Sequence, residues 1–549
     1  MKRSWVLILF LLLAFDMYAG EEDTVRVEVF DFKTPGPEGW NASYTGKAHF
    51  PDTGRWRQIL MVKTLKCDDA TKADSFPCGE WDYLTKTNIL LPDGDSVKHV
   101  NLSAFVTPYG KRLELGGEKG WQWVVDVTDY APVLKGSREI ISGNNQELLD
   151  LEFYFIEGVP DRDALGVMNV YPFGEYTYEH LADDSLMQET RIILNPEAEQ
   201  YMLRARIAGH GHAGPYNCCE WDEKMHTYRI DGMPLKWTVW KDCGFNPIYP
   251  QGGTWQFDRA GWCPGSEVDK MDFDITSLVN PGDTVKIDYD IEMYSGNGEK
   301  EGKFTMSHQL FSFGVANFGV DAMLADIISP TNRQEYGRYN PSCSEAVVII
   351  RNSGEVPLRS LQISYGILGE APQTYRWYGE LDFREEAQVH LPLTGNSGMS
   401  ENGVFYAEVS KPNGREDEQP YNNRMETPFT RPEILPADFV IHIETNDLGR
   451  AAENRLIIYD AAGRVVFEHG MYQDSTTYDH VPDLQPGCYR MELYDDQEDG
   501  LIRHWWNYYE DKTRVGKNGR LEIHHSNGDL IRELPFDFGE KMLLEFVVR

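Results

Sequence analysis

The chain has 549 residues, with 52 Lys and Arg against 88 Asp and Glu, which gives a formal net charge of −36 at pH 7. A field of this sign repels polyanions, so nucleic acids and anionic lipid surfaces are excluded as partners. The length exceeds what one hydrophobic core supports, and we expect three or four domains.

The first predicted element is an export signal. Lys2 and Arg3 precede an apolar run from Trp5 to Phe15, and a small residue follows at Ala19. This order is typical of a signal peptide over residues 1–20. No later segment approaches the twenty apolar residues of a transmembrane helix. We therefore expect a secreted or periplasmic protein without a transmembrane segment, and leave association with the cell surface open.

Apolar residues alternate along much of the chain, as they do in half-buried β-strands. Val25, Val27 and Val29 alternate near the start, and residues 285–293 have the same period. Turn signals recur between such runs, and no long amphipathic helical pattern stands out. The pattern predicts an all-β chain of sandwiches or jelly rolls.

The predicted domains follow one another in chain order. A first domain covers residues 21–180, and a second covers residues 181–318. Residues 319–430 have the strand spacing of a small immunoglobulin-like, adhesion-type sandwich. A linker at 431–436 then opens the last predicted domain, a β-sandwich over residues 431–549.

Eight cysteines in an exported chain are expected to form disulfides. Four of them are close enough in sequence to close two loops, as Cys67–Cys78 and Cys243–Cys263. The pairing of the other four stays open. The adjacent Cys218 and Cys219 are harder to pair, while Cys343 and Cys488 stand alone and could be free and buried.

Two Cys-Glu-Trp elements, CGEWD at 78–82 and CCEWD at 218–222, each place a carboxylate beside a tryptophan. They lie about one domain length apart and suggest that two domains meet at one site. Around the second element, polar and aromatic residues are dense between predicted strands, where binding residues concentrate. The candidates there are His210, His212, Glu220, Trp221, His226, Arg259 and Trp262.

These motifs resemble those of the bacterial peptide:N-glycosidase F family. CGEWD, GHGHAGPY, CCEW and DRAGWCPG occur in the family's order between Val25 and Phe318, with VTPYG and DVTDY also fitting. The resemblance implies two adjacent eight-stranded jelly rolls over residues 21–180 and 181–318. It also implies an amidohydrolase that needs no cofactor. The reaction cleaves the amide between asparagine and the innermost N-acetylglucosamine of an N-linked glycan, giving aspartate and a glycosylamine.

The resemblance assigns Asp82 and Glu220 as the catalytic pair, at a groove between the two domains. An unactivated amide needs a base for the attacking water, and groups that stabilise the oxyanion and protonate the leaving nitrogen. We expect Asp82 to be the base. Glu220 is expected to hold the inner sugar or the water and to assist proton transfer, and one of the pair needs a raised pKa. The expected substrate-binding residues are Trp221, Arg259, Trp262, His210 and Tyr83, while Trp81 is expected to anchor its loop.

The chain departs from the family pattern at several positions. Tyr83 stands where the family has an arginine, and His210 stands where it has a tryptophan, which leaves a polar, titratable group instead of a stacking face. Asp222 replaces a cysteine. A third, assisting carboxylate is expected in the strand LDLEFYFIEG, with Glu152 and Glu157 as candidates. These changes put the accepted glycans, including core-fucosylated ones, in doubt more than the reaction.

Two other functions compete with this reading. A metal-dependent hydrolase could draw its ligands from His210, His212, Cys218, Cys219, Glu220 and His226, but their spacing matches no common zinc pattern. A non-catalytic glycan-binding or adhesion protein would need only the aromatic residues and the appended sandwich. Retention of both Asp82 and Glu220 favours the enzyme, and we expect a monomer acting on N-glycosylated proteins or peptides.

The last domain contains a separate acidic turn, YDDQEDGL at 494–501. Its Asp495, Asp496 and Asp499 are candidate calcium ligands, because hard oxygen ligands in a turn suit that ion. The spacing does not match an EF-hand, so a solvated acidic loop fits equally well. The sequence does not separate surface attachment, sorting and sugar binding as roles of this domain.

Overall fold

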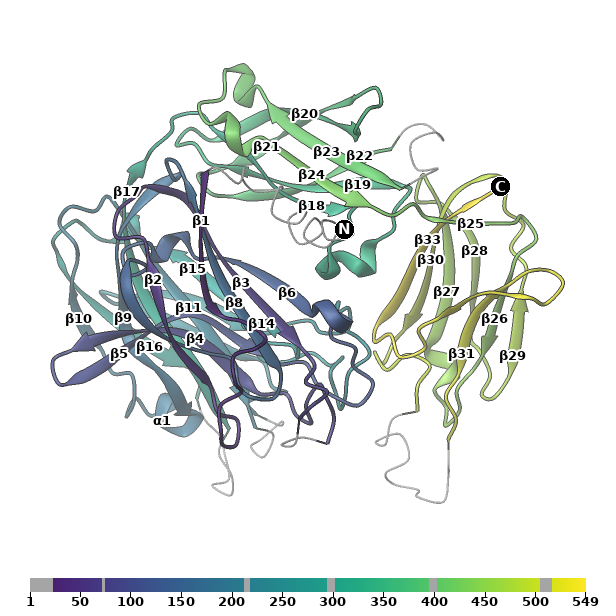
Figure 1. Ribbon diagram of the computed structural model, residues 1–549, viewed down its shortest axis with the longest axis horizontal. Helices are drawn as coiled ribbons and strands as arrows, with labels where there is room; N and C mark the ends of the chain where they lie inside the picture. Colours follow the sequence, from purple (N-terminus) through teal and green to yellow (C-terminus); the bar gives the residue numbers. More distant parts are fainter. Residues whose placement is uncertain (1–22, 72–74, 212–217, 294–301, 394–401, 504–515) are drawn as a thin grey trace, which may run out of the picture. The chain divides into compact units, whose positions relative to one another are not determined.

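The computed structural model describes residues 23–71, 75–211, 218–293, 302–393, 402–503 and 516–549, and the predicted signal peptide lies outside them. Residues 22–317 form one compact unit, and residues 318–549 belong to another. Almost all regular structure in both units is β-strand, with one short α-helix, α1 (Tyr178–Ala182), within the described ranges (Figure 1). The predicted all-β class is confirmed. No helix in this part of the chain is long and apolar enough to cross a membrane.

The unit of residues 22–317 begins with a β-sandwich whose two sheets have the strand orders β1-β8-β3-β6 and β14-β5-β4-β7-β2. Its own eight strands are β1 (Thr24–Phe30), β2 (Tyr44–Phe50), β3 (Trp56–Lys66), β4 (Leu84–Asp93), β5 (Ser96–Val106), β6 (Trp121–Asp126), β7 (Gly136–Ser142) and β8 (Leu148–Glu157). Alternate residues such as Ile59, Met61, Phe153 and Phe155 fill the space between the sheets. The period-two pattern of the sequence thus marks the buried face.

A second sandwich follows, with the strand orders β15-β11-β17-β9 and β10-β16-β12-β13. Its strands are β9 (Arg162–Thr177), β10 (Thr190–Ile193), β11 (Gln200–His210), β12 (Lys224–Ile230), β13 (Met233–Val239), β15 (Lys270–Asp274), β16 (Thr284–Ile291) and β17 (Lys303–Ala316). The short β14 (Ser266–Glu267) lies between β13 and β15 in sequence, yet it pairs with β5 of the first sandwich. A strand from the sequence of the second sandwich thus forms the edge of a sheet in the first.

The sheet that contains β11 and β17 is buried on both faces. Along β17, Phe304 and Met306 belong to the core of the second sandwich, whereas Phe311 and Phe313 belong to the core of the first. Neighbouring side chains of a strand point to opposite faces, so one sheet serves both cores. Polar bonds across the same junction include the one from Tyr130 Oη to Gln309 Oε1, at 2.8 Å. The loops of the two sandwiches are consequently held at a fixed separation.

The unit of residues 318–549 contains two further sandwiches. The first has the sheets β18-β19-β22 and β21-β20-β23-β24, and the second has β25-β33-β30-β27-β28 and β29-β26-β31-β32. The strands of the first are β18 (Ala322–Ser329), β19 (Glu345–Asn352), β20 (Leu358–Ile367), β21 (Gln373–Leu381), β22 (Glu386–Pro392), β23 (Gly403–Ser410) and β24 (Arg424–Phe429). Those of the second are β25 (Glu433–Leu435), β26 (Val440–Glu444), β27 (Asn454–Asp460), β28 (Val465–Gly470), β29 (Thr477–His480), β30 (Gly487–Asp495), β31 (Arg520–His524), β32 (Leu530–Leu534) and β33 (Lys541–Val548).

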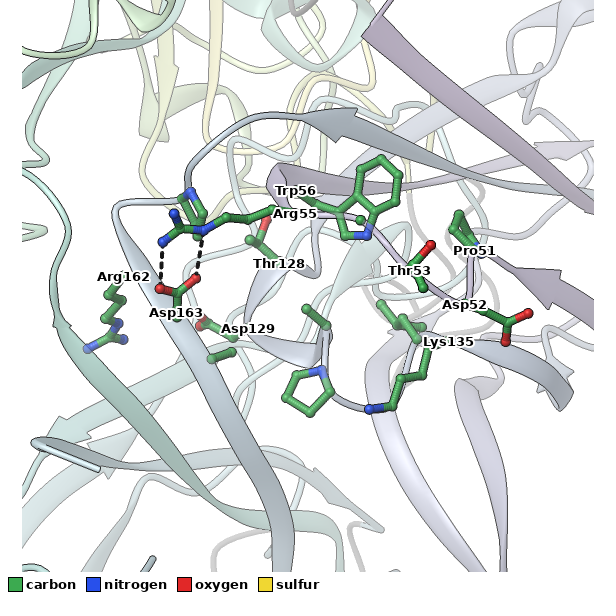
Figure 2. A pocket seen from close by; sticks show the side chains of 16 residues that line it. Pro51, Asp52, Thr53, Arg55, Trp56, Thr128, Asp129, Lys135, Arg162 and Asp163 are labelled. Carbon is green, nitrogen blue, oxygen red and sulfur yellow. Dashed lines mark hydrogen bonds and ion pairs between the residues drawn. The ribbon is translucent and has the colours of Figure 1, made fainter. Parts of the chain in front are cut away.

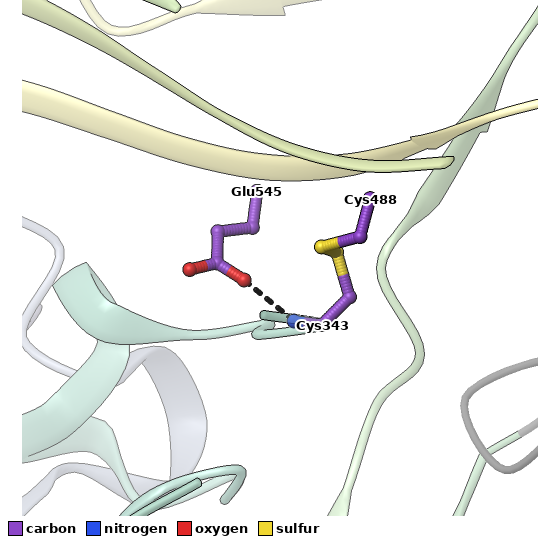
Figure 3. A group of neighbouring side chains, drawn as sticks. All are labelled: Cys343, Cys488 and Glu545. Atoms are coloured by element: carbon purple, nitrogen blue, oxygen red, sulfur yellow. Dashed lines mark hydrogen bonds between the residues drawn. A yellow bond between two sulfur atoms is a disulfide. The ribbon is translucent and has the colours of Figure 1, made fainter. Parts of the chain in front are cut away.

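A disulfide between Cys343 and Cys488 joins these two sandwiches (Figure 3). The carboxylate of Glu545 on β33 lies beside it and accepts hydrogen bonds from the Cys343 backbone N–H and from Ser342 and Ser344. Arg338 Nη1 also donates to the carbonyl oxygens of Phe538 and Lys541, at 2.8 and 3.0 Å. The two cysteines, which the sequence left open, are therefore a pair that connects two domains.

Candidate functional site

Asp82 lies on the loop between the Cys67–Cys78 disulfide and the start of β4. This loop is fixed by its backbone: the carbonyl of Trp81 accepts a hydrogen bond from Gln146 Nε2 at 2.8 Å, and Gly79 has φ +80°. A Cβ at Gly79 would lie 1.8 Å from the Gln146 side chain, so only glycine fits. Asp82, which lies on this fixed loop, is half-buried.

Glu220 lies on the loop that leads into β12, directly after a disulfide between the adjacent Cys218 and Cys219. Both of these cysteines are buried. The backbone N–H of Glu220 donates to the Gly211 carbonyl, and its own carbonyl accepts from Ala260 N, each at 3.0 Å. The glutamate is thus tied by its main chain to the segment that carries Arg259.

Arg259 is the centre of the site, and its side chain is fully buried. Its guanidinium Nε lies 3.4 Å from Glu220 Oε1. The guanidinium carbon lies 4.4 Å from the ring centre of Trp221 and 4.6 Å from that of Trp262. Nη2 donates to the carbonyl and the hydroxyl of Thr254. Nε therefore has an ion-pair partner in Glu220 but no hydrogen bond, and Nη1 is buried without a hydrogen-bond partner among the described residues. The Nη1 donor is the one that is available to a ligand.

The segment around Arg259 is itself anchored. Arg259 and Lys241 exchange backbone hydrogen bonds at 3.0 and 2.7 Å, and Cys243 is bonded to Cys263. Cys243 N donates to Asp258 Oδ1 at 2.9 Å. These backbone hydrogen bonds and the disulfide hold the segment in place, so the position of the buried guanidinium does not depend on its ion pair alone.

The charges of the site act on one another. Burial raises the pKa of Asp82 above its ordinary value, and the positive charge of Arg259 opposes this only in part. Burial lowers the pKa of Arg259, while the carboxylates of Asp82 and Glu220 raise it. Asp82 and Glu220, which come from two different sandwiches, therefore share one buried cation.

Tyr109, in the VTPYG motif, belongs to the same site although the sequence did not single it out. Burial raises the pKa of its phenol, and the negative charges of Asp82 and Glu220 add to that effect. The phenol is packed so closely on Gly253 that a Cβ there would lie 1.9 Å from the tyrosine oxygen. The aromatic residue within a family motif was the available signal.

His210 is next to the site but is not the titratable group that we expected. Its ring lies 5.0 Å from that of Trp262, and its Nε2 is buried without a hydrogen-bond partner in the described ranges. Burial, with a contribution from Lys303 and Arg259, lowers the pKa of His210 to about 3. The imidazole is therefore neutral near pH 7.

The predicted aromatic residues have distinct positions. Trp262 is buried, and its Nε1 donates to the Gly209 carbonyl at 2.7 Å. Its ring is thereby held in place against the guanidinium of Arg259. Trp221 is half-buried over the guanidinium. Trp81, expected to anchor its loop, has a ring that is 59% exposed. Tyr83 meets the exposed Trp40 edge to face, with ring centres 5.5 Å apart. Trp40 and Tyr83 thus form an aromatic pair, in which Tyr83 directly follows Asp82 in the sequence.

Neither candidate for the assisting carboxylate reaches this site. Glu152 is ion-paired with Arg26 and accepts a hydrogen bond from Tyr154, and Glu157 is exposed. The buried Glu147 lies closer, because its Oε1 accepts a hydrogen bond at 3.0 Å from Gln146 Nε2, which also binds the Asp82 loop. Glu147 directly precedes β8 and is therefore a further candidate for the assisting carboxylate, beside Glu152 and Glu157.

The ligands of the metal alternative do not assemble. Cys218 and Cys219 are bonded to each other, and His226 Nδ1 shares a hydrogen bond of 2.6 Å with Tyr289 in the second core. His212 lies outside the described residues. Within those residues, the groups of three metal-ligand side chains both lie in residues 318–549. One of them includes the disulfide-bonded Cys343 and Cys488, so it is not a metal centre.

The predicted acidic turn of the last domain is partly assembled. Asp495 and Asp499 are buried and lie close to Glu453, whereas Asp496 is exposed. Burial and the charges of its neighbours raise the pKa of Asp495 to about 8 and that of Glu453 to about 7. The cluster therefore differs from the predicted one by one member.

A separate pocket of about 290 Å³ lies between the first sandwich and the start of β9, and Figure 2 shows the side chains that line it. Arg55 and Asp163 form a two-bond ion pair on its wall, at 2.6 and 3.2 Å, and Trp56 and Lys135 also line it. None of its lining residues is one that the sequence predicted for the site.

Comparisons with known proteins point to one family. Residues 177–311 match the family model described as "Peptide-N-glycosidase F, C terminal". The amidase named "Peptide-N(4)-(N-acetyl-beta-D-glucosaminyl)asparagine amidase F", from Elizabethkingia miricola, is 27% identical over 318 residues, which cover 54% of this chain and 85% of that protein. A solved structure of "Recombinant peptide: N-glycanase F (PNGase F)" is 26% identical, with a TM-score of 0.46, and covers 53% of this chain and 96% of its own. That of a PNGase F from Flavobacterium meningosepticum is 25% identical, with the same score and coverages.

Proposed function

The chain belongs, through the part that these comparisons cover, to the peptide-N-glycosidase F family, and from this premise we propose that it is a glycoamidase of N-linked glycans. The proposed reaction hydrolyses the amide between asparagine and the innermost N-acetylglucosamine of glycoproteins or glycopeptides, and gives aspartate and a glycosylamine. The observation that carries the proposal is the convergence of Asp82 and Glu220 on the buried cation of Arg259.

In this proposal Asp82 is the base that takes a proton from the attacking water. Its raised pKa brings it nearer to neutrality, where a general base is both ionised and basic enough to be effective. The attack places negative charge on the amide oxygen. The buried Nη1 of Arg259 has no hydrogen-bond partner among the described residues, and it can stabilise that charge in a site of low dielectric.

Glu220, the ion-pair partner of Arg259, completes the proposed reaction. It directs the inner sugar or the water and assists proton transfer to the leaving nitrogen. Arg259 stabilises the Glu220 carboxylate at 3.4 Å, which is long enough for the pair to be shared with a substrate oxygen. The Trp221 face over the guanidinium, the Trp40–Tyr83 pair and the exposed Trp81 each offer an apolar surface to sugar rings.

The decisive experiment follows a defined N-glycopeptide by mass spectrometry, with the full chain and two pairs of variants. Asp82→Asn and Glu220→Gln are each expected to slow the conversion of asparagine to aspartate by about 10²- to 10⁴-fold. Asp69→Asn and Glu223→Gln alter exposed acids close by in sequence, and should retain wild-type rates.

Three results would count against the proposal. An intact glycopeptide that binds tightly to wild type would favour a glycan-binding protein. Release of the glycan with the asparagine unchanged would mean a glycosidase. Wild-type rates in Asp82→Asn would remove the proposed base. A core-fucosylated glycopeptide is digested in parallel. Its rate of cleavage shows whether a site with Tyr83 and His210 accepts core fucose.

We further propose that the chain acts in an oxidising compartment outside the cytoplasm, as a secreted or periplasmic monomer. Four disulfides within the described residues support this, because such bonds persist where thiols are not kept reduced. Fractionation of cells that express the full chain tests it, and recovery in the cytoplasm with free thiols would contradict it.

A further inference from the structure

The last sandwich contains three carboxylates that meet away from the glycoamidase site. Glu453 directly precedes β27, Asp495 ends β30, and Asp499 lies in the turn that follows β30. Each offers one oxygen, and these oxygens all lie within 4.8 Å of one another. Asp495 and Asp499 are only 2% and 1% exposed, so both carboxylates are shielded from bulk solvent.

The hydrogen bonds of the cluster leave oxygens unused. Asp495 Oδ1 accepts from the backbone N–H groups of Gln497 and Asp499, at 3.0 and 3.1 Å. Asp495 Oδ2 and Glu453 Oε1 are buried and have no hydrogen-bond partner among the described residues. Asn454 lies directly opposite Asp495 in the pairing of β27 with β30, and its side-chain Oδ1 is also buried without a hydrogen-bond partner among the described residues. Buried oxygens without partners are rare and are explained by an ion or a water.

Among the described residues, Arg450 is the cation that pairs with the cluster: its Nη1 lies 3.4 Å from Glu453 Oε2 and 3.6 Å from Asp499 Oδ2. Asp495 is 2% exposed and forms no ion pair within the part of the chain that the structure describes. A bound cation stabilises the ionised form of a carboxylate that is buried in this way.

We propose that Glu453, Asp495 and Asp499 form a binding site for a divalent cation of the hard, oxygen-preferring class, with Ca²⁺ favoured over Mg²⁺. An all-oxygen ligand set excludes the softer metals that select nitrogen or sulfur. Ca²⁺ accepts several protein oxygens in irregular geometry, while Mg²⁺ demands a strict octahedron and retains waters that this buried cluster has little room for. The ion would fasten the end of β30 to the start of β27 and stabilise the last sandwich.

The test titrates Ca²⁺ alone into the chelator-treated full chain by calorimetry, and follows thermal unfolding with and without the ion. Wild type is expected to bind about one Ca²⁺ and to unfold at a higher temperature in its presence. Glu453→Gln and Asp499→Asn should each weaken binding by at least about tenfold, because affinity follows the ligand charge. Asp496→Asn changes an exposed acid in the same turn and should bind as wild type does.

The outcomes separate the alternatives. No heat of binding and no thermal shift in wild type would overturn the proposal, and would mean that the cluster is held by shared protons. Equal loss in Asp496→Asn and Asp499→Asn would also overturn it, since the effect would then be that of general surface charge. If Glu453→Gln or Asp499→Asn fails to fold, the wild-type titration and the Asp496→Asn control still decide. A stronger response to Mg²⁺ than to Ca²⁺ would overturn the choice of ion.

Discussion

Arg259 Nε and Glu220 Oε1 are 3.4 Å apart, which is longer than the roughly 2.7–2.9 Å of a tight charge-assisted hydrogen bond. The pair is therefore coupled by charge without being closed by a short bond. A short hydrogen bond between Arg259 and Glu220 would use donor and acceptor capacity that a substrate needs. This open geometry, inside a frame held by the Cys243–Cys263 disulfide, is what a preorganised site for developing negative charge requires.

Replacing Arg259 with Gln should slow the reaction by about 10²- to 10³-fold, the usual effect of losing one oxyanion donor. It should also shift the pH dependence. Arg259 lowers the pKa of Asp82, so its loss raises that pKa further, and the acidic limb of kcat/KM should move to higher pH. The measurement is a pH–rate profile of both proteins. An unmoved limb would mean that Asp82 does not titrate beside Arg259.

Asp82→Asn should slow the reaction by the factor given above without loss of stability. Because burial raises the folded-state pKa of Asp82, this residue contributes stability below its unfolded pKa, and that contribution is lost as pH rises through the folded pKa. At neutral pH an uncharged amide should therefore be equal or better in thermal unfolding. A variant that melts well below wild type near pH 7 would show that the carboxylate is a structural partner.

His210→Phe should leave the shape of the pH–rate profile unchanged between about pH 5 and 8, the range in which an unperturbed histidine titrates. The reason is that burial holds the pKa of His210 at about 3, so the wild-type ring is already neutral there. The rates of the variant and the wild type should differ only by a factor that is constant over this pH range, and that factor reports contact of the ring with sugar. Disappearance of a limb in the variant would mean that His210 takes part in proton transfer.

Two isosteric changes compare the assisting carboxylates. Glu147→Gln alters the group that contacts Gln146 below the Asp82 loop, and should lower kcat with little change in melting temperature. Glu152→Gln breaks the ion pair with Arg26 on the first sheet, and should affect stability by no more than about 1 kcal/mol while leaving kcat unchanged. The reverse pattern would restore Glu152 as the assisting residue.

Motifs predicted the parts of the site that lie on short loops. Asp82, Glu220 and Arg259 each belong to a compact run of unusual residues, and the structure brings these three runs together. Glu147 is not marked by any motif, because its link to the Asp82 loop is a hydrogen bond through Gln146 to a residue more than sixty positions earlier. Such a relay leaves no local pattern.

Long-range partners escaped the sequence for the same reason. Cys343 and Cys488 are separated by 145 residues, and only the pairing of two sandwiches brings them together. Glu453 reaches Asp495 because β27 and β30 are neighbours, while the adjacent Asp496 turns to solvent as the strand ends. Alternation predicted that strands exist, but strand order decides which distant carboxylates meet.

The Cys343–Cys488 bond also changes what a protease can do to this chain. A single cut anywhere in the main chain between these two residues would leave both fragments covalently joined. The hydrogen bonds from Cys343 and Ser344 to Glu545 would also remain. A nicked molecule would run as one band on a non-reducing gel and separate only when reduced. Outside the cell, where proteolysis is frequent and reductant is scarce, such damage would not detach either sandwich from its neighbour.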